Sequence, residues 1–314
     1  MTTYVLRRLL QILPTLFVVS LVVFGLMRLV PGDPAQVFAG QDATKAQIDI
    51  VRTEFGLDRP VYVQYLIWLR RLMAGDLGVS YHTGRSVREL VTQKLAATIE
   101  LTVASMAIAL GIGIPASVLA AIRRKTAADR LATVTVLVGL SLPSFCLGIV
   151  LILVFAMWLH LLPPIGYVPL QESPARNLRF LVLPALTLGI ILAAPIMRFM
   201  RAGMLDVLLE DYVRTARAKG LRGRTVVARH VFKNAAMPTL TMVGLQVGEL
   251  LGGTAGVEVV FAWPGIGRLI ADSIFQRDYA VIQAVVLLLA VTFVVINLLV
   301  DVLYARLDPR VRLG

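Results

Sequence analysis

The chain has 314 residues, of which 58% are hydrophobic and only 16% are charged, with a formal net charge of +12. An average soluble domain carries roughly 25% charged residues, so this composition excludes a soluble globular protein. Several apolar runs reach the ~20 residues that a helix needs to cross a hydrocarbon core of ~30 Å, which predicts an all-α, polytopic membrane protein.

The first apolar run, Leu9–Met27, follows Arg7 and Arg8, as the core of a signal peptide would. Its 19 residues exceed the length of such a core, which is usually roughly 7–15 residues. We therefore expect an uncleaved first transmembrane helix within residues 1–30.

Residues 31–98 are the longest polar region. They open with Pro31-Gly32-Asp33-Pro34, whose prolines prevent the first helix from continuing. Further on, Val61–Met73 combines two tyrosines and a tryptophan with two arginines. Aromatic side chains with a polar tip favour the membrane–water interface, which predicts an interfacial helix here. Plain packing of this helix against the spans would explain the same residues.

Five more runs are suited to crossing the membrane, which gives six spans in all. They are Leu101–Ile122, Leu131–Trp158, Phe180–Met197, Met237–Phe261 and Tyr279–Leu303.

The basic residues decide the orientation of these spans. The segments expected inside hold 18 Lys/Arg in 66 residues, and those expected outside hold 11 in 106 residues. Because cytoplasmic loops carry the excess of Lys and Arg, both termini are expected in the cytoplasm. The charge lies beside apolar runs and forms no soluble basic face, so no nucleic-acid partner is expected.

The most basic inner segment, Asp211–Pro238, contains seven Lys/Arg and one acid. A helix is expected over Asp211–Lys219, ending at Gly220 in the left-handed conformation that glycine adopts easily. A second helix is expected over Thr225–Ala236, and Pro238 is expected to begin the next span, since proline is tolerated in a first helical turn. A basic elbow of this kind at a membrane surface suits the binding of another protein.

No enzyme chemistry is visible in the sequence. The glycine-rich run Gly220–Thr225 lacks the GxxxxGK[ST] spacing of a P-loop, and there is no HExxH motif. Cys146 is the single cysteine, and His82, His160 and His230 are scattered, so neither a disulfide nor a metal site is expected. The chain is predicted not to be an enzyme and to bind no cofactor, so uphill transport would take its energy from a partner.

A few polar residues within the spans are candidates for a translocation path. Gln246 and Glu249 lie i, i+3 apart midway along the fifth span, and Ser141 and Ser144 interrupt the third. A carboxylate that faces lipid is costly, so Glu249 is expected to point inward. There it either pairs with a partner protein or lines the path.

The fifth span also carries a glycine every four residues. The four are Gly244, Gly248, Gly252 and Gly256. Such a ridge lets a neighbouring helix approach closely. It is either a contact within the bundle or with a partner, or a smooth surface that slides or lines a pore.

Motifs along nearly the whole chain resemble the permease subunits of binding-protein-dependent ABC importers, in the dipeptide/oligopeptide branch that also includes nickel and glutathione systems. These motifs are Pro31-Gly32-Asp33-Pro34, Gly56-Leu57-Asp58 with Gln64-Tyr65, Gly75-Asp76-Leu77-Gly78, Leu142-Pro143-Ser144-Phe145, Phe261-Ala262-Trp263-Pro264-Gly265-Ile266-Gly267, Arg277-Asp278-Tyr279 and Asn297-Leu298-Leu299-Val300-Asp301. The resemblance implies the type I ABC importer permease architecture. Residues 99–314 would be the permease core, after a first transmembrane helix (1–30) and an external region with interfacial helices (31–98).

In that family a cytoplasmic EAA loop docks on the ATPase subunit, which implies this role for residues 198–236. The residues that align with it are Arg214, Thr215, Ala216, Arg217, Ala218, Lys219, Gly220 and Leu221. The signature glutamate is replaced by Arg214, so the ion pair that it makes cannot be carried over. We expect Gly220 to be the hinge and Ala216 with Ala218 to give a small docking face.

The resemblance also implies the partners and the mechanism. The partners are a second, homologous permease, two ATP-binding cassette subunits that bind ATP and magnesium, an external substrate-binding protein and membrane lipid. Transport would proceed by alternating access in a bacterial inner membrane. Peptides are the first expectation for the substrate, with glutathione and nickel as alternatives.

Two other classes are weighed against this interpretation. An ion-coupled secondary transporter would show an inverted repeat and more buried carboxylates. A membrane scaffold whose basic elbow binds anionic lipid would need the charge but no glycine at one point.

Overall fold

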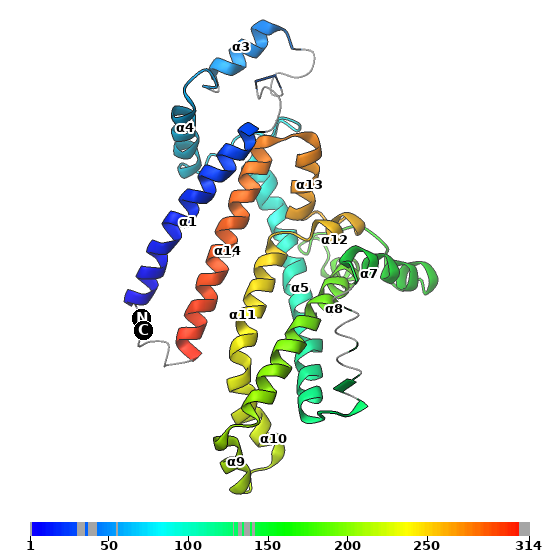
Figure 1. The fold of residues 1–314 in the computed structure, drawn as a ribbon. Coiled ribbons are helices and arrows are strands. Elements are labelled where there is room, and N and C mark those ends of the chain that lie inside the picture. The colour runs from blue at the N-terminus through cyan, green and yellow to red at the C-terminus, as the bar shows by residue number, and fades with distance from the viewer. Residues whose placement is uncertain are drawn as a thin grey trace.

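The computed structural model describes residues 2–29, 35–36, 43–54, 56–127, 129–130, 134, 139 and 142–307. Within these ranges the elements are helices, and the only β pairing is an isolated bridge between Val79 and Ser86. Figure 1 shows an elongated bundle with α3, α4 and α13 at one end and α9 and α10 at the other. The predicted all-α class is confirmed.

Three described helices are long and apolar enough to cross a membrane, namely Val87–Ile122, Pro174–Val207 and Tyr279–Leu303. They belong to α5 (Val87–Ile122), α8 (Pro174–Val207) and α14 (Tyr279–Leu307). Shorter apolar stretches, Ile12–Gly25 and Ser144–Trp158, fall in the first and third predicted spans.

The first and last long helices lie side by side. α1 (Thr2–Leu29) runs along α14, and the start of α1 points toward the same end of the bundle as the end of α14 (Figure 1). The end of α5 and the α9–α10 region lie toward that end as well. These segments therefore lie toward one end of the bundle, and the side of the membrane that this end faces stays a prediction.

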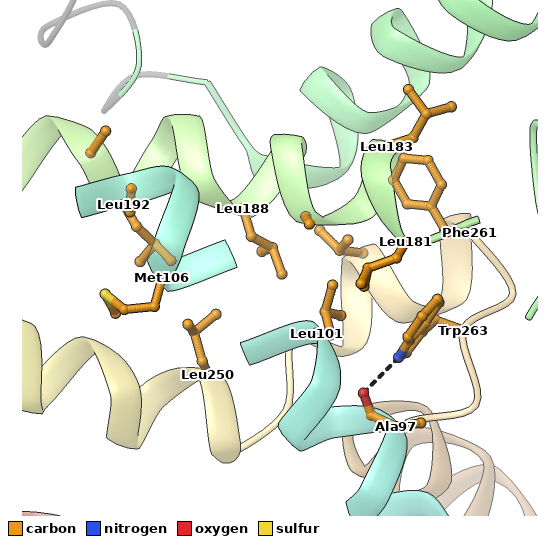
Figure 2. Packing of buried hydrophobic residues seen from close by; sticks show 14 of the residues in the cluster. Ala97, Leu101, Met106, Leu181, Leu183, Leu188, Leu192, Leu250, Phe261 and Trp263 are labelled. Atoms are coloured by element: carbon orange, nitrogen blue, oxygen red, sulfur yellow. Dashed lines mark hydrogen bonds between the residues drawn. The ribbon is translucent and has the colours of Figure 1, made fainter. Parts of the chain in front are cut away.

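The centre of the bundle is formed by α5 and α8, because small residues let the two backbones approach closely. A Cβ placed on Gly113 would lie 2.9 Å from the Ala193 carbonyl oxygen, and one on Gly189 would lie 2.6 Å from Cγ2 of Ile108. Apolar side chains such as Leu101 pack around this contact, and Figure 2 shows them together with the indole of Trp263.

The fifth predicted span is broken. α11 (Phe232–Leu251) ends before Gly253, and α12 (Ala255–Val260) follows separately. Gly253 has a φ of +92°, and a Cβ on it would lie 2.5 Å from the backbone of Gly267, so the chain turns there under close packing. Glu249 therefore lies two residues from the end of α11. The sequence analysis placed it in the middle of a span, which is wrong.

The start of this span also differs from the expectation. Gly223–Thr225 (α10), a wider π-helical segment η2 (Val226–Val231) and α11 follow one another without a break, so Pro238 lies inside α11. The helix does not restart at the proline because membrane helices tolerate proline where neighbours satisfy the freed backbone groups.

The glycine ridge of α11 is a contact within the bundle. A Cβ on Gly244 would overlap the side chain of Val300, and one on Gly248 would lie 3.0 Å from Cδ2 of Phe293. Both neighbours belong to α14, so these two glycines allow the close packing of α11 on α14. This outcome favours the first of the two interpretations of the ridge.

Two helices of the predicted external region are described, α3 (Lys45–Glu54) and α4 (Val61–Met73). The bounds of α4 match the predicted interfacial helix. Its Tyr65 packs edge-on against Phe24 of α1, with ring centroids 5.3 Å apart, and its hydroxyl lies 2.8 Å from the Ser20 hydroxyl. Packing against α1 thus accounts for part of the aromatic content of this helix.

The remaining elements complete the bundle. The third predicted span is described from α7 (Ser144–Leu151) into a π-helical segment η1 (Ile152–Trp158). The helix α13 (Ile266–Gln276) follows α12 and covers the start of α5.

Candidate functional site

The elbow between α8 and α11 is built around a helix end. α9 (Asp211–Ala218) is followed by Gly220 with a φ of +79°, as the sequence predicted. The Gly220 N–H donates to the Arg217 carbonyl at 2.9 Å and the Leu221 N–H to the Ala216 carbonyl at 3.4 Å. These two bonds are the Schellman pattern, which satisfies the last carbonyls of a helix and needs a left-handed residue at this position.

One face of α9 packs on the bundle. Val213 and Ala216, three residues apart, are buried against Met200 and Met204 of α8 and Val231 of η2. The Ala216 methyl therefore faces inward, so the expected small docking face of Ala216 and Ala218 is not formed. The periodicity of α9 could have shown this, because Val213 and Ala216 are the apolar residues at helical spacing.

The exposed residues of the elbow include both large apolar groups and cations. Leu209, Tyr212 and Leu221 are 64%, 41% and 42% exposed. The basic residues among them are also exposed. They are Arg214, Arg217, Lys219, Arg222 and Arg224. Exposed apolar side chains gathered beside charged ones are typical of a protein-binding surface.

The elbow is tied to the start of α11 by contacts that the sequence analysis missed. The Asn234 side-chain amide donates to the Tyr212 hydroxyl at 3.0 Å. A Cβ on Gly203 of α8 would lie 2.9 Å from the Ala235 carbonyl oxygen of α11, so only glycine fits at this crossing. Movement of α9 would therefore be passed to both α8 and α11.

A partly buried ion pair lies beside the elbow. Arg201 of α8 donates from Nε and Nη2 to the two carboxylate oxygens of Asp129, which also accepts the Lys125 N–H at 3.0 Å. Hydrogen bonds from Arg201 and then from Lys125 hold the pKa of Asp129 below its usual range. The signal available in the sequence was a single acid in the basic turn 123–130.

The candidate path residues are not brought together. Gln246 is buried and its side-chain amide donates to the Leu192 carbonyl of α8 at 3.2 Å, whereas Glu249 lies on the exposed surface of α11. Ser144 begins α7. Ser141 lies outside the described residues.

The opposite end of the bundle is closed by residues from the recognised motifs. The Trp263 indole donates to the Ala97 carbonyl at 2.9 Å, and the Ile266 N–H donates to the Thr98 hydroxyl at 2.8 Å (Figure 2 shows the first bond). The buried carboxylate of Glu258 accepts the Arg268 N–H at 2.7 Å near the start of α13. This part of the motif therefore has a structural role, which sequence reasoning did not assign.

No cluster of His, Cys, Asp and Glu suited to a metal ion occurs within the described ranges. The elbow offers exposed surface and hydrogen-bonded joints but no arrangement of nucleophile and base. What this site can do is bind another macromolecule and transmit movement to the helices.

The chain is similar to known proteins along most of its length. Residues 113–313 match the family described as binding-protein-dependent transport system inner membrane component, and residues 1–102 match its N-terminal companion. The chain is 45% identical over 312 residues to the glutathione transport system permease protein GsiC of Escherichia coli strain CFT073, and it is equally similar to that of strain K12, with 99% of each chain covered.

The fold is shared with solved importers. The inward-facing MetNI methionine ABC transporter aligns with a TM-score of 0.58 and 19% identity, over 70% of this chain and 96% of that one. An amino acid ABC transporter aligns with a TM-score of 0.51 and 17% identity, over 69% of this chain and 94% of that one. With an all-helical bundle, apolar spanning helices and these matches along its length, the chain belongs to the family of inner membrane components of binding-protein-dependent ABC importers.

Proposed function

We propose that this permease imports small peptides, with glutathione as the first substrate to test. The relatives that are 45% identical over 99% of their length are glutathione transport permeases, which supports this class. Glutathione is itself a tripeptide, so the proposal agrees with the peptides expected from the sequence. The external binding protein would select the substrate and deliver it.

The elbow is proposed to dock on an ATPase subunit. The observation that carries this proposal is the exposure of Leu209, Tyr212 and Leu221 in the same segment as exposed arginines and a lysine. Because Val213 and Ala216 fix α9 to α8 and η2, a push on this segment would move the bundle. ATP-driven closure of the ATPases would then shift the helices between inward and outward openings.

The complete importer would contain a second, homologous permease, two ATPases and the binding protein. ATP and magnesium would be bound by the ATPases, and this chain would carry out no chemistry of its own. Both termini and the elbow would lie in the cytoplasm, and residues 31–98 outside. Within the complex, Glu249 is proposed to face the second permease or the path between the two.

Reconstitution tests this function. The complete complex in liposomes should take up radiolabelled glutathione only with ATP inside and the binding protein outside. A variant with Leu209→Asp and Leu221→Asp should lose ATPase co-purification, because the charges oppose burial of the docking face. The matched control, Leu170→Asp and Leu178→Asp, changes two exposed leucines of the opposite end and should retain the ATPases. Equal retention by both variants would contradict docking through the elbow.

A further inference from the structure

A cavity of about 280 Å³ lies at the end of the bundle that carries α3 and α4. Its walls come from α1, α3, α4, the segment 76–81 and the first turns of α14. The apolar part of the lining includes Leu57, Ile67, Leu72, Leu77, Ala284 and Leu287. The transport cycle proposed above makes no use of this cavity.

Aromatic rings and arginines make up much of the remaining lining. Trp68 of α4 lies 5.6 Å from Phe24 of α1 between ring centroids, and Tyr81 and Tyr279 also line the space. The lining contains three arginines, Arg28, Arg52 and Arg71, and one acid, Asp76. The cavity is therefore amphipathic, with a surplus of positive charge.

Arg28 is held in place by a buried amide. Its guanidinium lies 4.5 Å from the centroid of the Phe24 ring and donates to the side-chain oxygen of Gln64. The Gln64 nitrogen in turn donates to the carbonyls of Leu57 at 3.1 Å and Arg59 at 2.6 Å. Since Gln64 is only 8% exposed, its amide positions this cation before any ligand arrives.

The three arginines of the lining differ in their ionic partners. Arg52 is bonded to Asp49 at 2.9 Å, which engages its charge. Among the residues that the structure describes, neither Arg28 nor Arg71 forms a salt bridge with a carboxylate. Guanidinium groups without a carboxylate partner are suited to the bidentate binding of a phosphate.

The apolar walls indicate which phosphate compound would fit. Phe24 and Arg28, near the end of α1, line the cavity, and the exposed side chains of Phe17, Leu21 and Val22 lie earlier along the same helix. A ligand with an anionic head and a long apolar tail would use both surfaces, whereas a soluble anion would use the arginines alone.

We propose that this cavity binds one anionic glycerophospholipid from the leaflet that meets this end of the bundle. Its phosphate lies between Arg28 and Arg71, and its glycerol and upper acyl chains lie on the apolar walls. The bound lipid fills the space between α1, α4 and α14 and so holds the N-terminal helices against the core of the permease.

The first test uses the purified full chain in detergent and native mass spectrometry, with dioleoyl phosphatidylglycerol and dioleoyl phosphatidylcholine at equal concentration. The wild-type chain should retain phosphatidylglycerol over phosphatidylcholine by about tenfold, and Arg28→Gln with Arg71→Gln should abolish this preference. The control variant, Arg85→Gln with Arg88→Gln, removes the same charge from exposed positions on the same side and should behave as the wild type. An unchanged preference in the cavity variant, or an equal loss in the control, overturns the proposal.

A second test leaves the cavity arginines in place. In a Trp158→Phe background, two tryptophans remain, the cavity residue Trp68 and the buried Trp263. Brominated phosphatidylglycerol should quench the fluorescence more than brominated phosphatidylcholine at the same concentration. Equal quenching overturns the proposal, as does displacement of the brominated lipid by an equal concentration of glycerol 3-phosphate, which would identify a soluble phosphate as the ligand.

Discussion

Asp129 and Arg201 are joined by two hydrogen bonds, 2.8 Å from Nε to Oδ1 and 3.0 Å from Nη2 to Oδ2. The pair links the turn after α5 to α8, ten residues before α9 begins. Asp129 is 7% exposed and the Arg201 side chain is 26% exposed, so the pair is partly shielded from water. The ion pair therefore fixes the end of α5 against the helix that leads into the elbow.

We expect Asp129→Asn to lower the stability of the purified chain by about 1–2 kcal/mol, because Arg201 and the Lys125 N–H lose a charged acceptor. Thermal unfolding in detergent measures the change. The control is Asp211→Asn, which breaks an exposed pair with Arg214 at 3.4 Å and should cost less than about 0.5 kcal/mol. An equal effect of the two substitutions would contradict the special role of Asp129.

The same ion pair predicts a pH dependence. The pKa of Asp129 is lower in the folded chain than in the unfolded one, because Arg201 stabilises the carboxylate. Its contribution is therefore fully present above the unfolded value of about 4 and is lost as the pH falls through the folded pKa. Between pH 6 and pH 3 the wild type should lose more stability than Asp129→Asn, in melting curves recorded at both values. Parallel losses would show that other groups cause the acid sensitivity.

Gly220→Val should destabilise the elbow by about 1–3 kcal/mol, because a β-branched residue is strained at a φ of +79°. Space is not the cause, since a Cβ there meets nothing within 4 Å. Asn tolerates this conformation, so Gly220→Asn should retain both ATPase binding and transport in liposomes. Wild-type transport by Gly220→Val would refute the importance of this conformation.

The close packing of α11 on α14 can be tested at its glycines. Gly244→Ala should destabilise the chain by about 1–3 kcal/mol, because the new methyl group overlaps Val300. Gly111→Ala in α5 is the matched control, since a Cβ there meets nothing within 4 Å and alanine favours the helix. Thermal unfolding should separate the two variants, and a neutral Gly244→Ala would mean that α14 moves aside without cost.

Hydropathy and glycine chemistry predicted much of this fold. The bounds of α4, the end of α9 and the left-handed Gly220 follow from local preferences that the structure leaves unchanged. The break at Gly253 could not be read from the sequence, because it depends on the approach of Gly267, a residue of α13. The helical spacing of Ala216 with Val213 indicates its inward position, whereas the family resemblance placed it on the docking face.

Long-range polar bonds were also beyond sequence reasoning. Asp278 accepts a hydrogen bond from the Ser80 hydroxyl, although the two residues are 198 positions apart. Asp278 belongs to one motif of the family resemblance, and Ser80 lies two residues after another. Neither motif indicates that the two residues are bonded to each other. Gln246 and Glu249 show the same difficulty at short range, since equal polarity on neighbouring turns did not reveal that one is buried and the other exposed.

Glu249 gives the sharpest test of the proposed assembly. It lies on the exposed surface of α11, whose other side packs through Gly244 and Gly248 on α14, while Gln246 is bonded to α8. A carboxylate left facing lipid is costly, so we expect the second permease or the path to cover it. We expect pairing with the second permease, so Glu249→Gln should lower recovery of the permease pair on affinity purification. A path role would instead leave assembly intact and lower the uptake of substrates with a free amino group. Normal assembly and transport by both Glu249→Gln and Glu249→Leu would rule out both roles and show that the carboxylate is merely tolerated.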